Sequence, residues 1–261
     1  MTKLSGTICN DTRASADRPP RSGGEAQDGP STKLSGTICN DTRASADRPP
    51  RSGGEAQDGP STKSSETTAL YIEPATGLLA GVRQVLSPHF DARPKDLAPE
   101  LIVVHGISLP AGEFGGPWID RLFAGNLPPD AHPSFRETAA LRVSAHAVIR
   151  RDGALTQYVP FGMRAWHAGQ SQYQGRSGCN DFSVGIELEG TDETPYTEAQ
   201  YESLARLVSA LLATYPTLSA QRITGHSDIA PGRKTDPGPV FEWARLRNLL
   251  AEHRQTTERR A

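Results

Sequence analysis

Two histidines and one aspartate have the residue types and surroundings of a metal site. His105 and His226 each follow a short apolar stretch and adjoin a glycine, and Asp236 lies ten residues beyond His226. Two imidazoles and one carboxylate are a common zinc ligand set, and three protein ligands leave a fourth position for water or substrate. The spacing matches no short metal-binding motif, so from spacing alone the alternative that these are ordinary structural side chains stays open.

Glu187 and Lys234 could supply the other groups of a hydrolytic site. Glu187 lies in the alternating segment 183–189, on the side opposite its Val, Ile and Leu residues, where a carboxylate facing a cleft could accept a proton. Lys234, two residues before Asp236, could stabilise an oxyanion. Two alternatives stay open: Glu187 and Glu189 could be solvated residues on an exposed face, and Lys234 could be an ordinary surface lysine.

Short strands are expected to position the two histidines. Residues 101–104 are a fully apolar run that predicts a buried strand ending at His105, and residues 222–224 predict a short strand running into His226. Strand ends of an open α/β sheet are where sites tend to be built. This placement favours a functional role for both histidines.

The remaining segments alternate between strand and helix signals. Residues 145–150 and 154–159 flank an Asp-Gly pair, which is typical of a β-hairpin. Thr197 and Gln200 form a capping-box pattern ahead of apolar residues spaced by three and four, which predicts a helix ended by a proline. Shorter helices are expected over residues 117–124, 133–141 and 240–252. The pattern predicts an α/β fold, a single domain with a mixed β-sheet flanked by helices.

The chain divides into two parts of different composition. It has 261 residues, and its seven Phe, six Tyr and three Trp all lie at or after Tyr71. Residues 2–31 recur unchanged at 32–61 and are poor in apolar residues. This composition predicts a disordered N-terminal segment over residues 1–70, because so little apolar surface cannot offset the entropy lost on ordering. The folded domain is expected over residues 71–261.

Composition also limits the classes of function. A net charge of −2 argues against binding to nucleic acid or to a membrane surface by bulk charge, and no apolar run approaches the ~20 residues of a membrane span. The start of the chain shows no apolar core of a secretory signal. Cys179 is the only cysteine of the expected domain, which fits a reducing compartment. We therefore expect a cytoplasmic protein.

Five segments of the expected domain resemble a known enzyme family. They are residues 101–116, 141–150, 164–175, 179–190 and 224–239. Over about residues 79–250 the chain is similar to the AmpD family, the 1,6-anhydro-N-acetylmuramyl-L-alanine amidases of Gram-negative bacteria. That family is part of the wider group of zinc amidases similar to bacteriophage lysozyme-type amidases and peptidoglycan recognition proteins.

The resemblance implies a role for each candidate residue. It makes His105, His226 and Asp236 the zinc ligands, Glu187 the proton acceptor and Lys234 the stabiliser of the transition state. It implies zinc-dependent hydrolysis of the amide between (anhydro-)N-acetylmuramic acid and L-alanine in peptidoglycan recycling. The expected partner is an anhydro-muropeptide substrate, bound by a monomer.

Three further residues are candidates for contacting that substrate. Trp166 offers a flat apolar face to the glycan or the peptide, His167 adjoins it, and Arg142 could pair with a stem-peptide carboxylate. The sequence departs from the family pattern at Gly106 and Gly178, where many relatives have Asn and Arg. Both look like substrate-side positions, so the departures put substrate affinity in question.

Two other functions are compatible with the same fold. A non-catalytic peptidoglycan-binding module typically lacks a zinc ligand, whereas this sequence has all three candidates. A cell-wall autolysin acting on polymeric peptidoglycan needs export, and the missing signal argues against it. The sequence therefore favours the recycling amidase.

Overall fold

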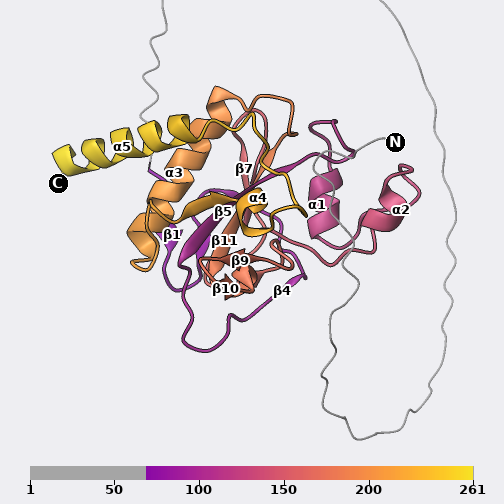
Figure 1. Cartoon of the computed structure of the whole chain (residues 1–261), viewed down its shortest axis with the longest axis horizontal. Helices are drawn as coiled ribbons and strands as arrows, with labels where there is room; N and C mark the ends of the chain where they lie inside the picture. Colours follow the sequence, from indigo (N-terminus) through magenta and orange to yellow (C-terminus); the bar gives the residue numbers. More distant parts are fainter. Residues whose placement is uncertain (1–68, 261) are drawn as a thin grey trace, which may run out of the picture. The chain divides into compact units, whose positions relative to one another are not determined.

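The computed structural model describes residues 69–260, which form a six-stranded mixed sheet between two groups of helices (Figure 1). The strand order is β12-β5-β11-β6-β7-β3. The first four strands run parallel, and β7 is antiparallel to β6 and parallel to β3. The six strands are β3 (Arg83–Gln84), β5 (Leu101–Ile107), β6 (Ala147–Ile149), β7 (Leu155–Gln157), β11 (Ser183–Glu189) and β12 (Ile223–Gly225).

The other elements surround this sheet. Three short antiparallel pairs are β1 (Ile72–Glu73) with β2 (Leu78–Leu79), β4 (Phe90–Asp91) with β8 (Arg164–Ala165), and β9 (Gln172–Tyr173) with β10 (Arg176–Ser177). The helices are α1 (Trp118–Phe123), α2 (Phe135–Thr138), the 3₁₀ turn η1 (Cys179–Asp181), α3 (Glu198–Thr214), α4 (His226–Ile229) and α5 (Trp243–Arg260). The predicted α/β class with a mixed sheet flanked by helices is confirmed.

The predicted N-terminal segment, residues 1–70, lies outside the described residues except for its last two. Of these, Leu70 packs against the core. Within residues 69–260, no helix has both the length and the apolar character needed to cross a bilayer.

Strand β11 is the centre of the sheet, and its alternation separates the two faces. Val184, Ile186 and Leu188 are fully buried and join the apolar core shared with α3. Gly185 and Glu187 therefore point to the opposite face, as predicted. One face of the sheet packs on the main core beneath α3, and the other carries polar groups beside two smaller apolar clusters, which include Val103 and Val148.

Helix α3 covers the apolar face, and α5 packs alongside it (Figure 1). The predicted capping box is present: the Gln200 backbone N–H donates to the Thr197 hydroxyl at 3.2 Å, and the Thr197 N–H donates to the Gln200 side chain at 3.1 Å. The predicted apolar stripe is buried, including Tyr201, Leu204 and Leu211.

Element ends differ from the sequence prediction in several places. Strand β5 continues past the expected end at His105 to Ile107, because β11 pairs with it as far as Glu189. Helix α2 is shorter than residues 133–141. Helix α5 extends beyond residue 252 to Arg260. The added residues are mostly polar helix formers without apolar periodicity, so the sequence pattern did not indicate this part of the helix. The predicted hairpin is confirmed by the antiparallel pairing of β6 with β7.

His146 forms hydrogen bonds with β11 and with the loop at Met163 through its two ring nitrogens. Its Nδ1 accepts a hydrogen bond from the Gly185 N–H at 3.0 Å, so Nε2 carries the ring hydrogen and donates to the Met163 carbonyl at 3.1 Å. The Arg93 guanidinium lies 3.3 Å from Nε2. Complete burial and this neighbouring charge lower the pKa of His146 to about 3, so the ring is neutral in the folded protein.

Replacing Thr197 with alanine should lower the free energy of unfolding by about 1–2 kcal/mol, because one α3 backbone N–H loses its acceptor. The Thr197 hydroxyl also donates to the Arg151 carbonyl at 2.7 Å. Urea denaturation measures the loss. Thr256→Ala, the same change at an exposed position of α5, is the matched control and should cost under about 0.5 kcal/mol. Equal losses in the two variants would contradict this role of the capping box.

Acidification should destabilise the protein through His146. Between its folded pKa of about 3 and an unfolded pKa of about 6.5, the unfolded chain binds a proton that the folded chain does not, so the free energy of unfolding falls as pH falls. One proton corresponds to about 1.4 kcal/mol per pH unit. His146→Gln should reduce the slope of unfolding free energy against pH, measured by urea denaturation between about pH 4 and 6. An unchanged slope would refute the assignment.

Candidate active site

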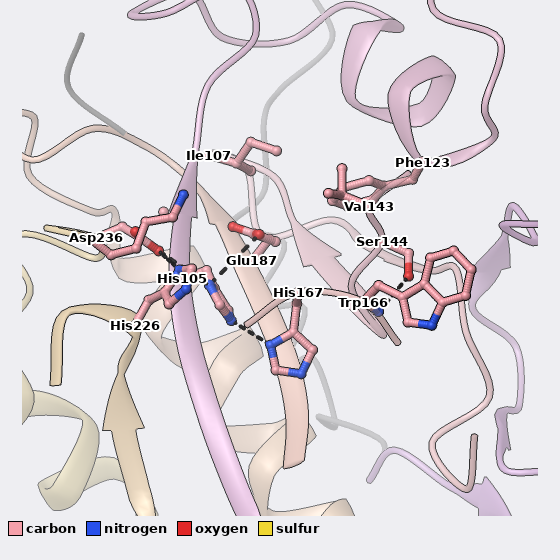
Figure 2. A pocket seen from close by; sticks show the side chains of 12 residues that line it. His105, Ile107, Phe123, Val143, Ser144, Trp166, His167, Glu187, His226 and Asp236 are labelled. Atoms are coloured by element: carbon pink, nitrogen blue, oxygen red, sulfur yellow. Dashed lines mark hydrogen bonds and ion pairs between the residues drawn. The ribbon is translucent and has the colours of Figure 1, made fainter. Parts of the chain in front are cut away.

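Three neighbouring parallel strands carry polar side chains to one edge of the sheet. Glu187 on β11 is directly opposite His105 on β5 in the register. On the other side of β5, Gly225 of β12 pairs with Val104, so His226 comes next to His105. The sheet order β12-β5-β11 thus brings His226, His105 and Glu187 together (Figure 2).

Asp236 completes the group from a loop after α4. The Ser227 N–H donates to the Asp236 carbonyl at 2.9 Å, which ties this loop to the start of α4. Asp236 Oδ2 lies 3.2 Å from His105 Nδ1 and 3.1 Å from His226 Nδ1, and the two Nδ1 atoms are 3.0 Å apart. All three residues are buried, and together they could hold a metal ion.

The donor chemistry of this group fits a cation. His226 Nε2 faces the Ala168 carbonyl at 3.3 Å. A carbonyl only accepts, so Nε2 carries a hydrogen, and the neutral form of this ring presents a lone pair on Nδ1. Burial and the nearby His226 lower the pKa of His105 to about 4, so the His105 ring is neutral. Two imidazoles and a carboxylate at such distances are the donor set that zinc prefers.

Glu187 is enclosed beside this donor set. Its side chain is 12% exposed, and Oε1 lies 4.0 Å from His105 Nδ1. The buried Oε2 has no hydrogen-bond partner among the described residues. Burial and the negative charge of Asp236 raise the pKa of Glu187 well above its usual value, against the opposing effect of Lys234. The alternative of a solvated Glu187 is therefore wrong, and the carboxylate has a free acceptor inside the site.

A cavity opens at this group and is partly apolar (Figure 2). Its lining residues are His105, Gly106, Ile107, Phe123, Val143, Ser144, Trp166, His167, Glu187, His226, Lys234 and Asp236. Seven of the eight residues singled out from the sequence are thus brought together, including Trp166 and Lys234. Arg142 is exposed and is not among the lining residues, so its contact with substrate stays a prediction.

Sequence reasoning missed the apolar wall of the cavity. Ile107 lies in the part of β5 that was expected to have ended, and Phe123 belongs to the buried side of α1. A signal for Phe123 was available, because the expected helix over 117–124 has one apolar side. Val143 precedes its strand and shows no periodic signal.

The two departures from the family pattern have local structural correlates. A Cβ atom at Gly106 would lie 2.4 Å from the Tyr196 hydroxyl, which donates to the Pro237 carbonyl at 3.0 Å. Tyr196 therefore fills the space beside Gly106. Gly178 has φ +75°, a left-handed conformation that glycine adopts without strain.

Comparison with known proteins agrees with this geometry. Residues 95–239 match the family model of N-acetylmuramoyl-L-alanine amidase. The chain is 64% identical over 176 residues to the 1,6-anhydro-N-acetylmuramyl-L-alanine amidase AmpD of Escherichia coli K12, covering 67% of this chain and 96% of the relative. It is 53% identical to the AmpD protein of Haemophilus influenzae over 169 residues, which is 65% of this chain and 92% of the relative.

A solved structure shares the fold. The crystal structure of a selenomethionine AmpD derivative superposes with a TM-score of 0.66 at 63% identity, covering 67% of this chain and 97% of that chain. The resemblance drawn from the sequence segments is confirmed. The chain therefore belongs to the N-acetylmuramoyl-L-alanine amidase family, among its AmpD members, and is an amide hydrolase.

Proposed function

We propose that this amidase hydrolyses the amide between 1,6-anhydro-N-acetylmuramic acid and the L-alanine of the stem peptide, and that the reaction depends on zinc. The observation that carries the proposal is the convergence of three buried metal donors beside the unpartnered carboxylate oxygen of Glu187. The names of the similar AmpD proteins supply the substrate class.

His105, His226 and Asp236 would hold the zinc ion. Zinc in a site of this kind acts as a Lewis acid that acidifies a water molecule and polarises a carbonyl group. The protein supplies a neutral imidazole at His105 for this purpose, because burial keeps the pKa of His105 low. It also encloses the two histidines, since His105 is 1% exposed and His226 is 4% exposed.

Glu187 would act as the general base and then as the general acid. Its Oε2 accepts the proton of the attacking water and afterwards delivers a proton to the nitrogen of L-alanine as the amide bond breaks. A raised pKa suits a group that must both accept and release a proton near neutral pH. The products are the muramyl carboxylic acid and a stem peptide with a free amino group.

Lys234 would stabilise the negative charge that develops on the amide oxygen, an effect worth roughly 3–4 kcal/mol for one well-placed donor. Trp166, Ile107 and Phe123 form apolar parts of the cavity, on which a sugar ring or an alanine methyl group can pack. We keep Trp166, His167 and Arg142 as proposed contacts to substrate.

The substrate class also supports a place in recycling. A 1,6-anhydro sugar has no free C1 through which another sugar could be joined, so it marks the end of a cleaved glycan strand. We propose that the enzyme acts on such released fragments in the cytoplasm. We also propose that the protein acts as a monomer, with residues 71–261 as the amidase domain after a separate N-terminal segment.

Removing the metal should abolish activity on anhydro-muropeptide while the fold remains. The assay incubates the protein with purified anhydro-muropeptide or with intact sacculi, with and without a chelator, and measures released stem peptide by chromatography. We expect chelator-sensitive release from the soluble fragment that one equivalent of zinc restores. Activity that survives complete metal removal would refute zinc dependence, and faster release from sacculi would favour an autolysin.

Glu187→Gln should keep zinc affinity and lose about 10²–10⁴-fold in kcat, because the amide cannot accept the proton. Glu113→Gln, the same change at an exposed position, is the matched control and should leave kcat unchanged. Bound zinc is quantified in each variant by metal analysis. A Glu187→Gln enzyme with near-normal kcat would remove Glu187 from the proton-transfer role.

A further inference from the structure

His167 lies between the candidate metal ligand His105 and the buried side chain of Ser183. Its Nδ1 is 2.9 Å from His105 Nε2, and its Nε2 is 3.1 Å from Ser183 Oγ. Ser183 Oγ is in turn 2.5 Å from the Cys179 carbonyl oxygen. Figure 2 shows the His167 ring directed at His105 on the side away from Asp236.

The direction of every hydrogen bond in this chain follows from its last member. A carbonyl oxygen only accepts, so the Ser183 hydroxyl donates to Cys179 and leaves its oxygen as an acceptor. His167 then donates from Nε2, and in the neutral ring its Nδ1 holds a lone pair. That lone pair accepts from the Nε2–H of His105, which places the lone pair of His105 on Nδ1.

This tautomer is the one that a metal requires. With its hydrogen on Nε2, His105 offers Nδ1 to the point where His226 Nδ1 and Asp236 Oδ2 converge. The other tautomer would place a hydrogen on Nδ1, where it could bond to Asp236 and block the metal. We propose that His167 and Ser183 are positioning residues that hold His105 in its metal-binding tautomer and thereby tighten zinc binding.

The backbone around His167 is built to keep the ring in place. A Cβ atom at Gly185 would lie 2.4 Å from the ring of His167, so only glycine lets the ring lie against β11. The N–H groups of His167 and Ala168 both donate to the Asn180 side-chain oxygen, at 3.0 and 2.8 Å. The position of the ring is therefore set by contacts that do not involve His105.

The proposal rests on the proposed zinc dependence and predicts a defined loss. Hydrogen-bond partners of metal-bound histidines typically contribute 10–100-fold to metal affinity. His167→Phe keeps an aromatic ring but removes the acceptor, and should weaken zinc binding by about that factor. His167→Asn places an amide oxygen near the former Nδ1 and should recover most of the affinity.

Ser183→Ala tests the far end of the chain of hydrogen bonds. It leaves His105 and His167 intact but removes the acceptor that keeps the His167 hydrogen on Nε2, so we expect about tenfold weaker zinc binding. Ser203→Ala on α3 is the matched control, because the Ser203 hydroxyl also donates to a backbone carbonyl, that of Gly153, at 2.7 Å. It should leave zinc affinity unchanged.

The experiment measures the zinc dissociation constant of the full-length protein by competition with a chromophoric chelator, and records the absorption spectrum of the cobalt-substituted protein. Circular dichroism checks that each variant is folded. If His167→Phe does not fold, the zinc affinities of Ser183→Ala and His167→Asn test the proposal in its place. Wild-type affinity in folded His167→Phe or Ser183→Ala, or equal losses in the Phe and Asn variants, would overturn the proposal. Absence of zinc binding by the wild-type protein would instead overturn the proposed function.

Discussion

Three electron pairs face one another at the buried edge of the sheet, on His105 Nδ1, His226 Nδ1 and Asp236 Oδ2. They are 3.0–3.2 Å apart, and the outward nitrogens of both rings already have partners. Without a positive charge between them, such groups repel each other, and burial removes the water that would otherwise screen them. Much of the nearby structure serves to keep these atoms together in spite of that repulsion.

The parallel register of β12, β5 and β11 is the main feature that keeps these donor atoms together. It fixes which side chains share the face opposite the apolar core, and a slip by one residue would turn His105 and Glu187 into that core. The apolar face holds the register, because Val184, Ile186 and Leu188 must stay buried under α3. The hydrophobic pattern of β11 therefore positions the polar groups on its other side.

Much of this arrangement could be predicted from local sequence signals. The alternation of β11, the capping box of α3 and the β6–β7 hairpin each depend on neighbouring residues, and the structure confirms them. The end of β5 could not be predicted, because pairing with β11 sets it.

Side-chain partners were harder to predict than elements. The cavity wall at Ile107 and Val143 depends on tertiary contacts that leave no periodic trace. The contact between His167 and His105 joins residues 62 apart in the chain, and nothing in the Trp-His-Ala-Gly stretch indicates which imidazole nitrogen carries a hydrogen. Such features are set by packing and by hydrogen-bond direction, which a sequence pattern does not encode.

The three donors come from distant parts of the chain. His105 is 121 residues from His226 and 131 from Asp236, so the group exists only while the sheet is intact. A cation bound there would have no equivalent site in the unfolded chain and would shift the folding equilibrium by RT ln(1 + [metal]/Kd). The thermal stability of the protein would then rise with the free metal concentration, and a metal-starved cell would hold a larger unfolded fraction of the same chain.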